Sequence, residues 1–116
     1  TVFVSGQLPL NEKGDLVSED LGCQTRKVIE NIEKVLKEAN MNLENVVKTT
    51  VYVTNLDDFR QINQTYAIYF AHPYPARSCI EVSNLPHNAK VKIDCVAVEA
   101  ETAHEEDCAG CCCSDE

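Results

Sequence analysis

Residues 46–55 read VVKTTVYVTN, a stretch that is β-branched almost throughout and predicts a strand in the middle of the chain. The next stretch, residues 56–70, changes to helical spacing. Asn55 or Asp57 can cap the start of this helix with its side-chain oxygen. The apolar positions that carry the helical period are Phe59, Ile62, Tyr66, Tyr69 and Phe70. The sequence therefore predicts a strand followed directly by a helix.

The segments on either side extend this pattern. Residues 1–7 alternate as a strand, and residues 28–39 have apolar side chains at helical spacing, with Asn40 as a C-terminal stop. Residues 76–83 and 89–100 predict a third and a fourth strand. The order strand, helix, strand, helix, strand, strand predicts an α+β layer, in which both helices pack on one face of a mixed β-sheet.

Alternation within the strands predicts two different sheet faces. The apolar set expected under the helices is Val2, Val4, Val51, Val53, Ile80, Val82, Val91, Ile93 and Cys95. The uncovered set, mixed in character, is Phe3, Ser5, Thr50, Tyr52, Thr54, Arg77, Cys79, Glu81, Lys92, Asp94, Val96 and Val98. Because several of these uncovered side chains are apolar, we expect the second face to meet another subunit in a homo-oligomer.

Charge is distributed unevenly along the 116 residues. Seven of the 19 acidic residues lie in residues 99–116, which contain no Lys or Arg, so residues 1–98 carry 12 acidic against 10 basic side chains. A nearly neutral body argues against nucleic-acid binding.

We expect one domain over residues 1–100 and a disordered, acidic, Cys-rich tail over residues 101–116. No apolar run approaches the roughly 20 residues of a membrane span and no signal-like start is seen, so the expected compartment is the cytoplasm.

The seven cysteines do not indicate a disulfide framework, because four of them lie in the tail. Cys23, Cys79 and Cys95 fall in helical or strand patterns, where a reduced thiol behaves as a small hydrophobic residue. The tail motif Cys108-x-x-Cys111 allows soft-metal binding or oxidation, although an unstructured extension with incidental thiols is favoured. The predicted domain contains no set of metal ligands, so we expect no metal site there.

Arg77 is the most informative candidate for chemistry. Pro75 rigidifies the entrance to its strand, and Ala76 leaves room around a planar cation that matches a carboxylate with two parallel hydrogen bonds. This arrangement suits a small organic acid, although an isolated Arg is more commonly a surface residue. Cys79 shares its strand parity and is either a second site residue or a buried structural thiol; no His is evidently paired with it.

Five stretches together resemble one family: SGQLPLN (5–11), VVKTTVYVTNLDDF (46–59), INQTY (62–66), YPARSCIEV (74–82) and LPHNAKVKIDCVAV (85–98). They are similar to the RidA family, also called YjgF, of reactive enamine and imine deaminases, in register from Thr1 to about Val98. The resemblance implies a chorismate-mutase-like subunit. It also implies a homotrimer whose sheets form a central barrel, with three clefts between subunits.

The resemblance also implies roles for individual residues. Arg77 matches the arginine that binds the substrate carboxylate, and Ser5, Gly6 and Asn63 match substrate-binding positions of the family. Cys79 matches the cysteine whose backbone carbonyl helps to hold the attacking water. The implied reaction is hydrolysis of 2-imino or enamine acids of the 2-aminoacrylate or 2-aminocrotonate type to 2-keto acids and ammonia, with no metal or cofactor.

Two positions depart from the family pattern. The glutamate that polarises the attacking water in the family corresponds to Lys92. Lys92 could act as a base if burial beside Arg77 removed its proton, or Asp94, on the same face about 6–7 Å along the strand, could substitute for the glutamate. Alternatively, Lys92 could only add a second cation. The family also starts with an extra strand carrying a cleft-closing tyrosine, whereas Thr1 already lies in the following strand; either that strand is truncated or the role of the tyrosine is missing.

These departures leave a second hypothesis, a non-catalytic small-carboxylate-binding or chaperone-like module of the same fold. A third, the ribonuclease activity attached by name to some family members, is disfavoured by the neutral body and the acidic tail.

Overall fold

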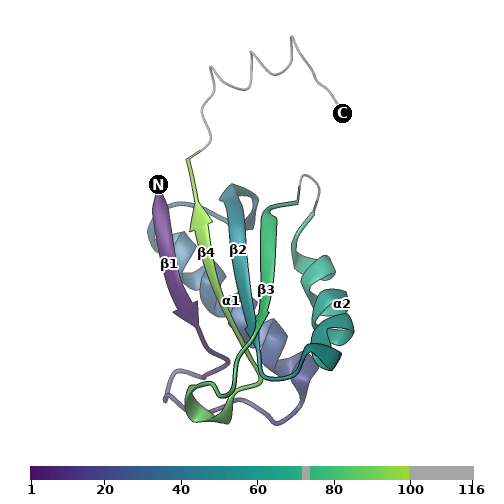
Figure 1. The fold of residues 1–116 in the computed structure, drawn as a ribbon. Coiled ribbons are helices and arrows are strands. Elements are labelled where there is room, and N and C mark those ends of the chain that lie inside the picture. The colour runs from purple at the N-terminus through teal and green to yellow at the C-terminus, as the bar shows by residue number, and fades with distance from the viewer. Residues whose placement is uncertain (72–73, 100–116) are drawn as a thin grey trace.

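A computed structural model describes residues 1–71 and 74–99, and in this part of the chain the elements follow the predicted order (Figure 1). The strands are β1 (Val2–Gln7), β2 (Val46–Val53), β3 (Ala76–Glu81) and β4 (Val91–Ala97), and the helices are α1 (Leu21–Glu38) and α2 (Phe59–Tyr69). Short 3-10 turns occupy Leu43–Asn45, Leu56–Asp58 and Pro86–Asn88. The predicted tail, residues 101–116, lies outside the described residues.

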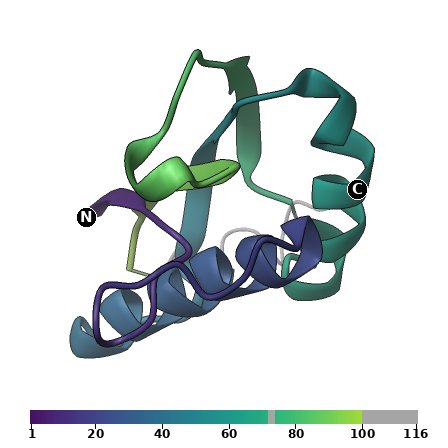
Figure 2. The same cartoon turned by 90° about the horizontal axis from the view of Figure 1, so that it is seen from below.

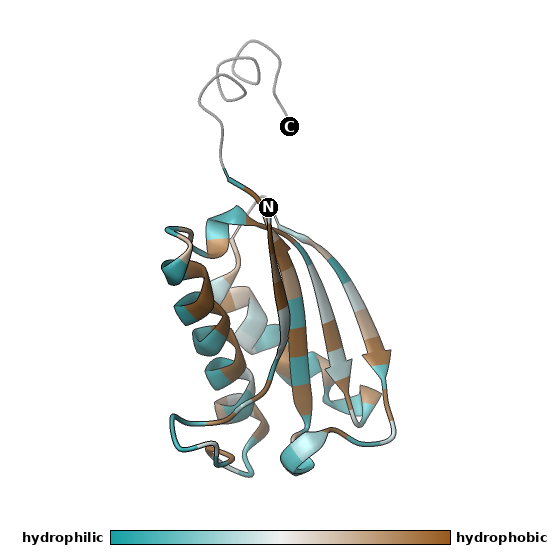
Figure 3. Ribbon diagram, turned by 90° about the vertical axis from the view of Figure 1, so that its left-hand side faces the viewer, coloured by the Kyte–Doolittle hydropathy of each residue, from teal (hydrophilic) through white to brown (hydrophobic). Residues whose placement is uncertain are grey.

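The four strands form one mixed sheet in the order β1-β4-β2-β3. β4 runs antiparallel to both β1 and β2, whereas β2 and β3 are parallel. Both helices lie on the same side of this sheet, α1 across the strands and α2 beyond β3 (Figures 2 and 3). The predicted α+β architecture, a mixed sheet with two helices on one face, is confirmed, and it leaves the other face open.

The ends of α1 follow from its capping residues. The Asp20 carboxylate accepts a hydrogen bond from the backbone N–H of Cys23 at 2.9 Å, which satisfies one of the free donors at the helix start. Asn40 then adopts a φ of 60°, in the left-handed region that Asn tolerates at a helix end. The predicted stop at Asn40 is therefore confirmed. The side chains that this helix buries completely include Val28, Ile29, Ile32 and Leu36.

The predicted core face is confirmed in three of the four strands. The predicted core residues of these strands that are at most 3% exposed are Val4, Val51, Val53, Val91, Ile93 and Cys95. On the open face, Phe3 pairs with Val96 and Tyr52 pairs with Lys92. Phe3 is 78% exposed, so a large apolar side chain stands on the face that no helix covers.

The predicted orientation of β3 is wrong. Arg77 pairs with the buried Thr49 and Cys79 pairs with Val51, so both side chains lie on the helix-covered side, whereas Ile80 is 44% exposed beside Tyr52 on the open face. Residues paired across neighbouring strands share a face. The physical reason is that the inward polar side chains find partners near α2: Glu81, for example, accepts the backbone N–H of Leu56 at 2.8 Å.

Cys23, Cys79 and Cys95 all carry free thiols, as expected from their place in regular elements, and they are exposed, partly buried and buried respectively. Within residues 1–71 and 74–99, no helix has the length and apolar character needed to cross a membrane.

Candidate functional site

The guanidinium of Arg77 lies against one face of α2. Its Nη1 donates a hydrogen bond to Oδ1 of Asn63 at 2.7 Å. Its Cζ lies 4.9 Å from the centre of the Phe59 ring and 4.7 Å from the centre of the Tyr66 ring. Both distances are within the range of a cation–π interaction. The structure thus brings together Arg77 and Asn63, two of the residues that the resemblance assigned to the site.

The spacing along α2 explains this arrangement. Phe59, Asn63 and Tyr66 follow one another at intervals of four and three residues, so they lie on one face of the helix. Arg77 reaches that face because it is the second residue of β3 and points to the helix-covered side. A polar acceptor and two aromatic rings therefore surround one cation.

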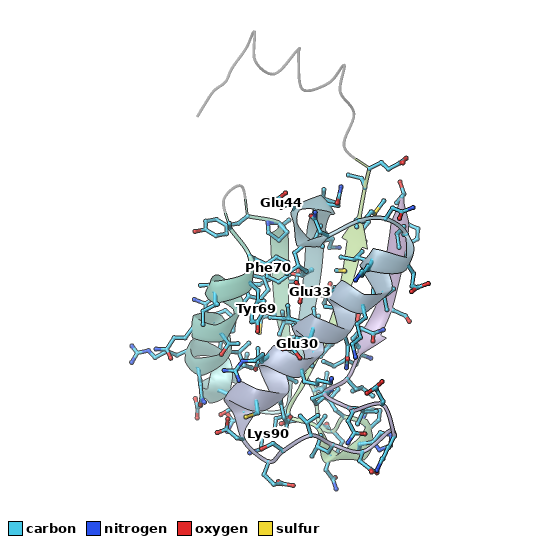
Figure 4. The ribbon with its side chains drawn as sticks, turned by 180° about the vertical axis from the view of Figure 1, so that it is seen from behind. Glu30, Glu33, Glu44, Tyr69, Phe70 and Lys90 are labelled. Carbon is cyan, nitrogen blue, oxygen red and sulfur yellow. The ribbon has the colours of Figure 1, made fainter. Side chains whose placement is uncertain are left out.

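Tyr66 is itself fixed by contacts with the core. Its hydroxyl forms a buried hydrogen bond with Oγ1 of Thr49 at 2.8 Å, and its ring stacks on Phe70 with 4.4 Å between ring centres. Figure 4 shows Phe70 at the end of α2, on the helix-covered side of the sheet. Burial raises the pKa of Tyr66, partly offset by the Thr49 hydrogen bond and the Arg77 charge. Tyr66 thus stays a neutral phenol at physiological pH.

Next to the guanidinium lies a pocket of about 440 Å³. It is lined by Asn63, Tyr66, Ala67, Tyr74, Pro75 and Arg77. This lining combines one cation and one amide with aromatic and apolar surface, the composition typical of a site for a small organic molecule. A small carboxylic acid fits it by placing its acid group on Arg77 and its hydrocarbon part along the apolar wall.

Cys79 lies two residues beyond Arg77 and is partly buried against the core. Desolvation raises the pKa of its thiol above the usual 9.0, and the nearby Arg77 charge opposes this only in part. The thiol is therefore protonated near neutral pH and is a poor nucleophile. This favours the alternative in which the Cys79 side chain packs and only its backbone is available to a ligand.

A second group of candidate residues lies at the other edge of the sheet. Ser5 and Gly6 fall in an irregular section of β1, where the register with β4 shifts between Val4 and Gln7. The Lys92 side chain lies directly against Gly6, at a place where any Cβ would collide with it. Gly6 therefore allows Lys92 to lie across β1, and the two residues form one surface.

Lys92 belongs to a small polar cluster on the open face. Its Nζ lies 4.9 Å from the centre of the Tyr52 ring, and the Tyr52 hydroxyl donates to Oδ2 of Asp94 at 3.3 Å. The negative charge of Asp94 is the main cause of a raised pKa at Tyr52. Oδ1 of Asp94 is buried and has no hydrogen-bond partner among the described residues. Asp94, the carboxylate nearest to Lys92 along β4, therefore has a hydrogen-bond partner for only one of its two oxygens among the described residues.

One chain does not bring the two groups together. Asn63, Arg77 and Cys79 lie at the β3 edge, whereas Ser5 and Gly6 lie at the β1 edge, three strand spacings of about 4.8 Å away. The expected common face for Ser5 and Cys79 is not formed, because Ser5 follows the helix-facing Val4 and Cys79 faces the helices itself.

Lys92 is also separated from Arg77. The two side chains lie on opposite faces of the sheet, since Lys92 pairs with Tyr52 and Arg77 pairs with Thr49. Placing Lys92 beside Arg77 within one chain is therefore wrong.

Sequence reasoning missed the aromatic part of this site. Phe59 and Tyr66 fit the apolar stripe of a helix, and the same spacing serves core packing and cation binding alike. The available signal was their separation of seven residues with Asn63 between them, together with an arginine entering a neighbouring strand. Only the strand register links these two observations.

Several known proteins resemble this chain in sequence and in fold. The sequence pattern of the family described as Endoribonuclease L-PSP matches residues 1–99. The chain is 43% identical over 97 residues to a RutC family protein of Pyrococcus abyssi, covering 83% of this chain and 76% of that protein. It is 40% identical over 100 residues to the 2-iminobutanoate/2-iminopropanoate deaminase of Salmonella typhimurium, covering 84% and 78%. The crystal structure of the YjgF gene product from Escherichia coli superposes with a TM-score of 0.79 at 38% identity, covering 84% and 80%.

The buried Thr49–Tyr66 hydrogen bond gives a prediction about stability. Thr49→Val leaves the Tyr66 hydroxyl without a partner, and an unsatisfied buried hydroxyl costs about 1–3 kcal/mol of unfolding free energy. Tyr66→Phe leaves Thr49 unsatisfied with a similar cost. The double variant removes both groups and is expected to be more stable than the sum of the two losses predicts. Urea unfolding followed by circular dichroism measures all four free energies, and strictly additive losses would contradict the pairing.

Proposed function

This chain belongs to the Endoribonuclease L-PSP family, the RidA/YjgF family, and on that premise we propose that it hydrolyses reactive 2-imino acids to 2-keto acids and ammonia. The substrates are of the 2-aminoacrylate or 2-aminocrotonate type, whose imine forms react with water. The observation that carries the proposal is the Arg77 cation, held at the edge of a pocket by Asn63 and two rings. Relatives named for this activity are 40% and 38% identical to the chain over 100 aligned residues.

The reaction requires little from the protein beyond orientation of the substrate and of the attacking water. Water adds to the electrophilic imine carbon, and the tetrahedral adduct expels ammonia to leave the keto acid. Arg77 binds the substrate carboxylate with paired N–H donors, which fixes the imine carbon relative to the attacking water. The backbone carbonyl of Cys79, two residues along β3, holds that water. The reaction needs a proton-transfer partner, and none of these steps uses a metal or cofactor.

The second part of the site comes from a neighbouring copy. Ser5 and Gly6 lie at the opposite sheet edge from Arg77, so they complete the site only when the β1 edge of one chain meets the β3 edge of another. The open face offers an apolar contact surface, including the exposed side chains of Phe3 and Ile80. We extend the proposal to a chorismate-mutase-like homotrimer, whose sheets form a central barrel and whose sites lie between subunits.

Lys92 supports a second candidate function. It occupies the position at which the deaminases of this family carry a water-polarising glutamate, and an ammonium that keeps its proton does not polarise water in that way. A site formed by Arg77 of one chain and Lys92 of a neighbouring copy would have two cations and would bind small carboxylates without rapid turnover. In the catalytic alternative, Asp94, two residues along the same face of β4, supplies the carboxylate.

The ribonuclease activity in the family description fits this chain poorly, because residues 1–98 carry 12 acidic against 10 basic side chains. We assign the protein to the cytoplasm, where reducing conditions keep free thiols such as Cys23 and Cys95 unoxidised.

Removal of the Arg77 guanidinium tests the carboxylate clamp. Purified protein added to a pyridoxal-phosphate dehydratase with serine or threonine is expected to accelerate keto-acid release. Arg77→Ala is expected to lower kcat/KM by about 10- to 150-fold, the loss typical of hydrogen bonds to a charged group. Arg60→Ala is the matched control, because Arg60 is an exposed arginine on α2 and its loss leaves the pocket lining intact. Equal activity of the two variants would contradict the role of Arg77.

A charge change at Lys92 separates the two candidate functions. If the site is catalytic but lacks a strong water-polarising group, Lys92→Glu is expected to raise the rate in the same coupled assay by about 100-fold or more, the usual range for one acid–base group. Lys37→Glu, an equal charge change at an exposed position of α1 and away from the open face, is the control. Binding of 2-ketobutyrate by the unaltered chain without any acceleration would favour the carboxylate-binding module.

The mass of the particle in solution tests the shared site. Light scattering at micromolar concentration is expected to give about three times the 12.9 kDa of one chain. Phe3→Asp places a charge on the open face and is expected to shift the equilibrium toward monomer, with loss of activity in proportion. A monomeric unaltered chain that retains full activity would contradict sites formed between copies.

A further inference from the structure

We propose that Phe59 and Tyr66 form an aromatic slot that fixes the plane of the Arg77 guanidinium, and that Phe59 is a positioning residue for carboxylate binding. The inference rests on the proposed function, because it assigns the residues that hold the carboxylate clamp in place. The term aromatic slot denotes the rings of Phe59 and Tyr66 with the guanidinium between them.

The distances place the guanidinium between the rings. Seven residues of α-helix rise about 10.5 Å, and Phe59 and Tyr66 are seven residues apart on α2. The Cζ of Arg77 is 4.9 Å from one ring centre and 4.7 Å from the other, so one planar cation contacts both rings. Arg77 is exposed to solvent, but its contacts with both rings restrict rotation of the cation out of its plane.

Asn63 fixes the cation within that plane. It lies between the two aromatic residues on the same helix face, and its Oδ1 accepts from Nη1 of Arg77 at 2.7 Å. This bond uses one of the five N–H donors of the guanidinium. The remaining donors include a pair on one edge, which is what a carboxylate needs for two parallel hydrogen bonds. The slot and the amide together leave that pair available to a ligand.

Pre-orientation of Arg77 has a direct consequence for affinity. A free arginine side chain has many rotamers, and a ligand that must select one of them binds more weakly. The slot restricts these rotamers before the ligand arrives. Because the rings contact the faces of the cation while a carboxylate binds at its edge, the two interactions do not compete.

The two rings differ in what else they do. Tyr66 is only 5% exposed, belongs to the hydrophobic core and bonds to Thr49, so its loss would disturb packing as well as the slot. Phe59 is half-buried at the first residue of α2, and the core cluster of the described residues does not include it. Core packing therefore explains why residue 66 is aromatic but not why residue 59 is. A substitution at Phe59 consequently tests the slot with little effect on the core.

The test compares three variants of the full chain by calorimetric titration with 2-ketobutyrate, alongside their melting temperatures. Phe59→Leu is expected to weaken binding by about two- to fivefold, the effect of one exposed cation–π contact, with little change in melting temperature. Phe59→Tyr retains the ring and is expected to restore the affinity. Tyr69→Leu removes an aromatic ring of the same helix that belongs neither to the pocket lining nor to the ring contacts of Arg77, and it is expected to leave the affinity unchanged.

The possible results separate this inference from the proposed function. If the unaltered chain does not bind 2-ketobutyrate, the proposed function is overturned and the slot loses its role with it. If the unaltered chain binds and Phe59→Leu binds equally well, only the slot is overturned. A loss in Phe59→Leu that Phe59→Tyr does not restore, or that follows the melting temperature, assigns Phe59 a structural role and also overturns the inference.

Discussion

Arg77 lies on the helix-covered side of the sheet because β3 pairs with β2 in a parallel register that sets Arg77 opposite Thr49. In a strand, a shift of one residue would turn every side chain to the other face. Arg77 would then point away from α2, and Asn63, Phe59 and Tyr66 would lose the cation that they surround. Thr49 also bonds to the Tyr66 hydroxyl, so the same residue of β2 aligns the strand that carries the cation and the ring that contacts it.

The strand order adds a second constraint. β1 and β3 are the two outer strands, and the residues that the family resemblance assigns to one site are divided between them. A single chain therefore carries the carboxylate clamp at one edge and the Ser5–Gly6 surface at the other. A site built from both edges needs two chains, which ties the proposed activity to assembly rather than to the folding of one subunit.

Much of this fold was predictable from the sequence, because the helices and three of the strands have a single apolar face. Val28, Ile29 and Ile32 have no plausible place except against a sheet, and Asn40 ends their helix as expected. β3 was not predictable in this way. Its apolar residue Ile80 lies on the open face, while Arg77 and Glu81 face inward and find partners on and before α2. Alternation identifies the faces of a strand but not the polar partners that decide which face is covered.

Alternation also does not predict the contacts that the polar side chains make on the open face. A buried carboxylate oxygen without a donor is unfavourable, and Oδ1 of Asp94 has none among the described residues. Lys92, the nearest cation on β4, directs its ammonium to the Tyr52 ring instead of to Asp94. Water or a neighbouring chain that donated to Oδ1 would remove this cost. The proposed reaction needs a carboxylate to orient water, and Asp94 lies beside Lys92 on this face, so the identity of residue 92 and the assembly of the subunits bear on the same few atoms.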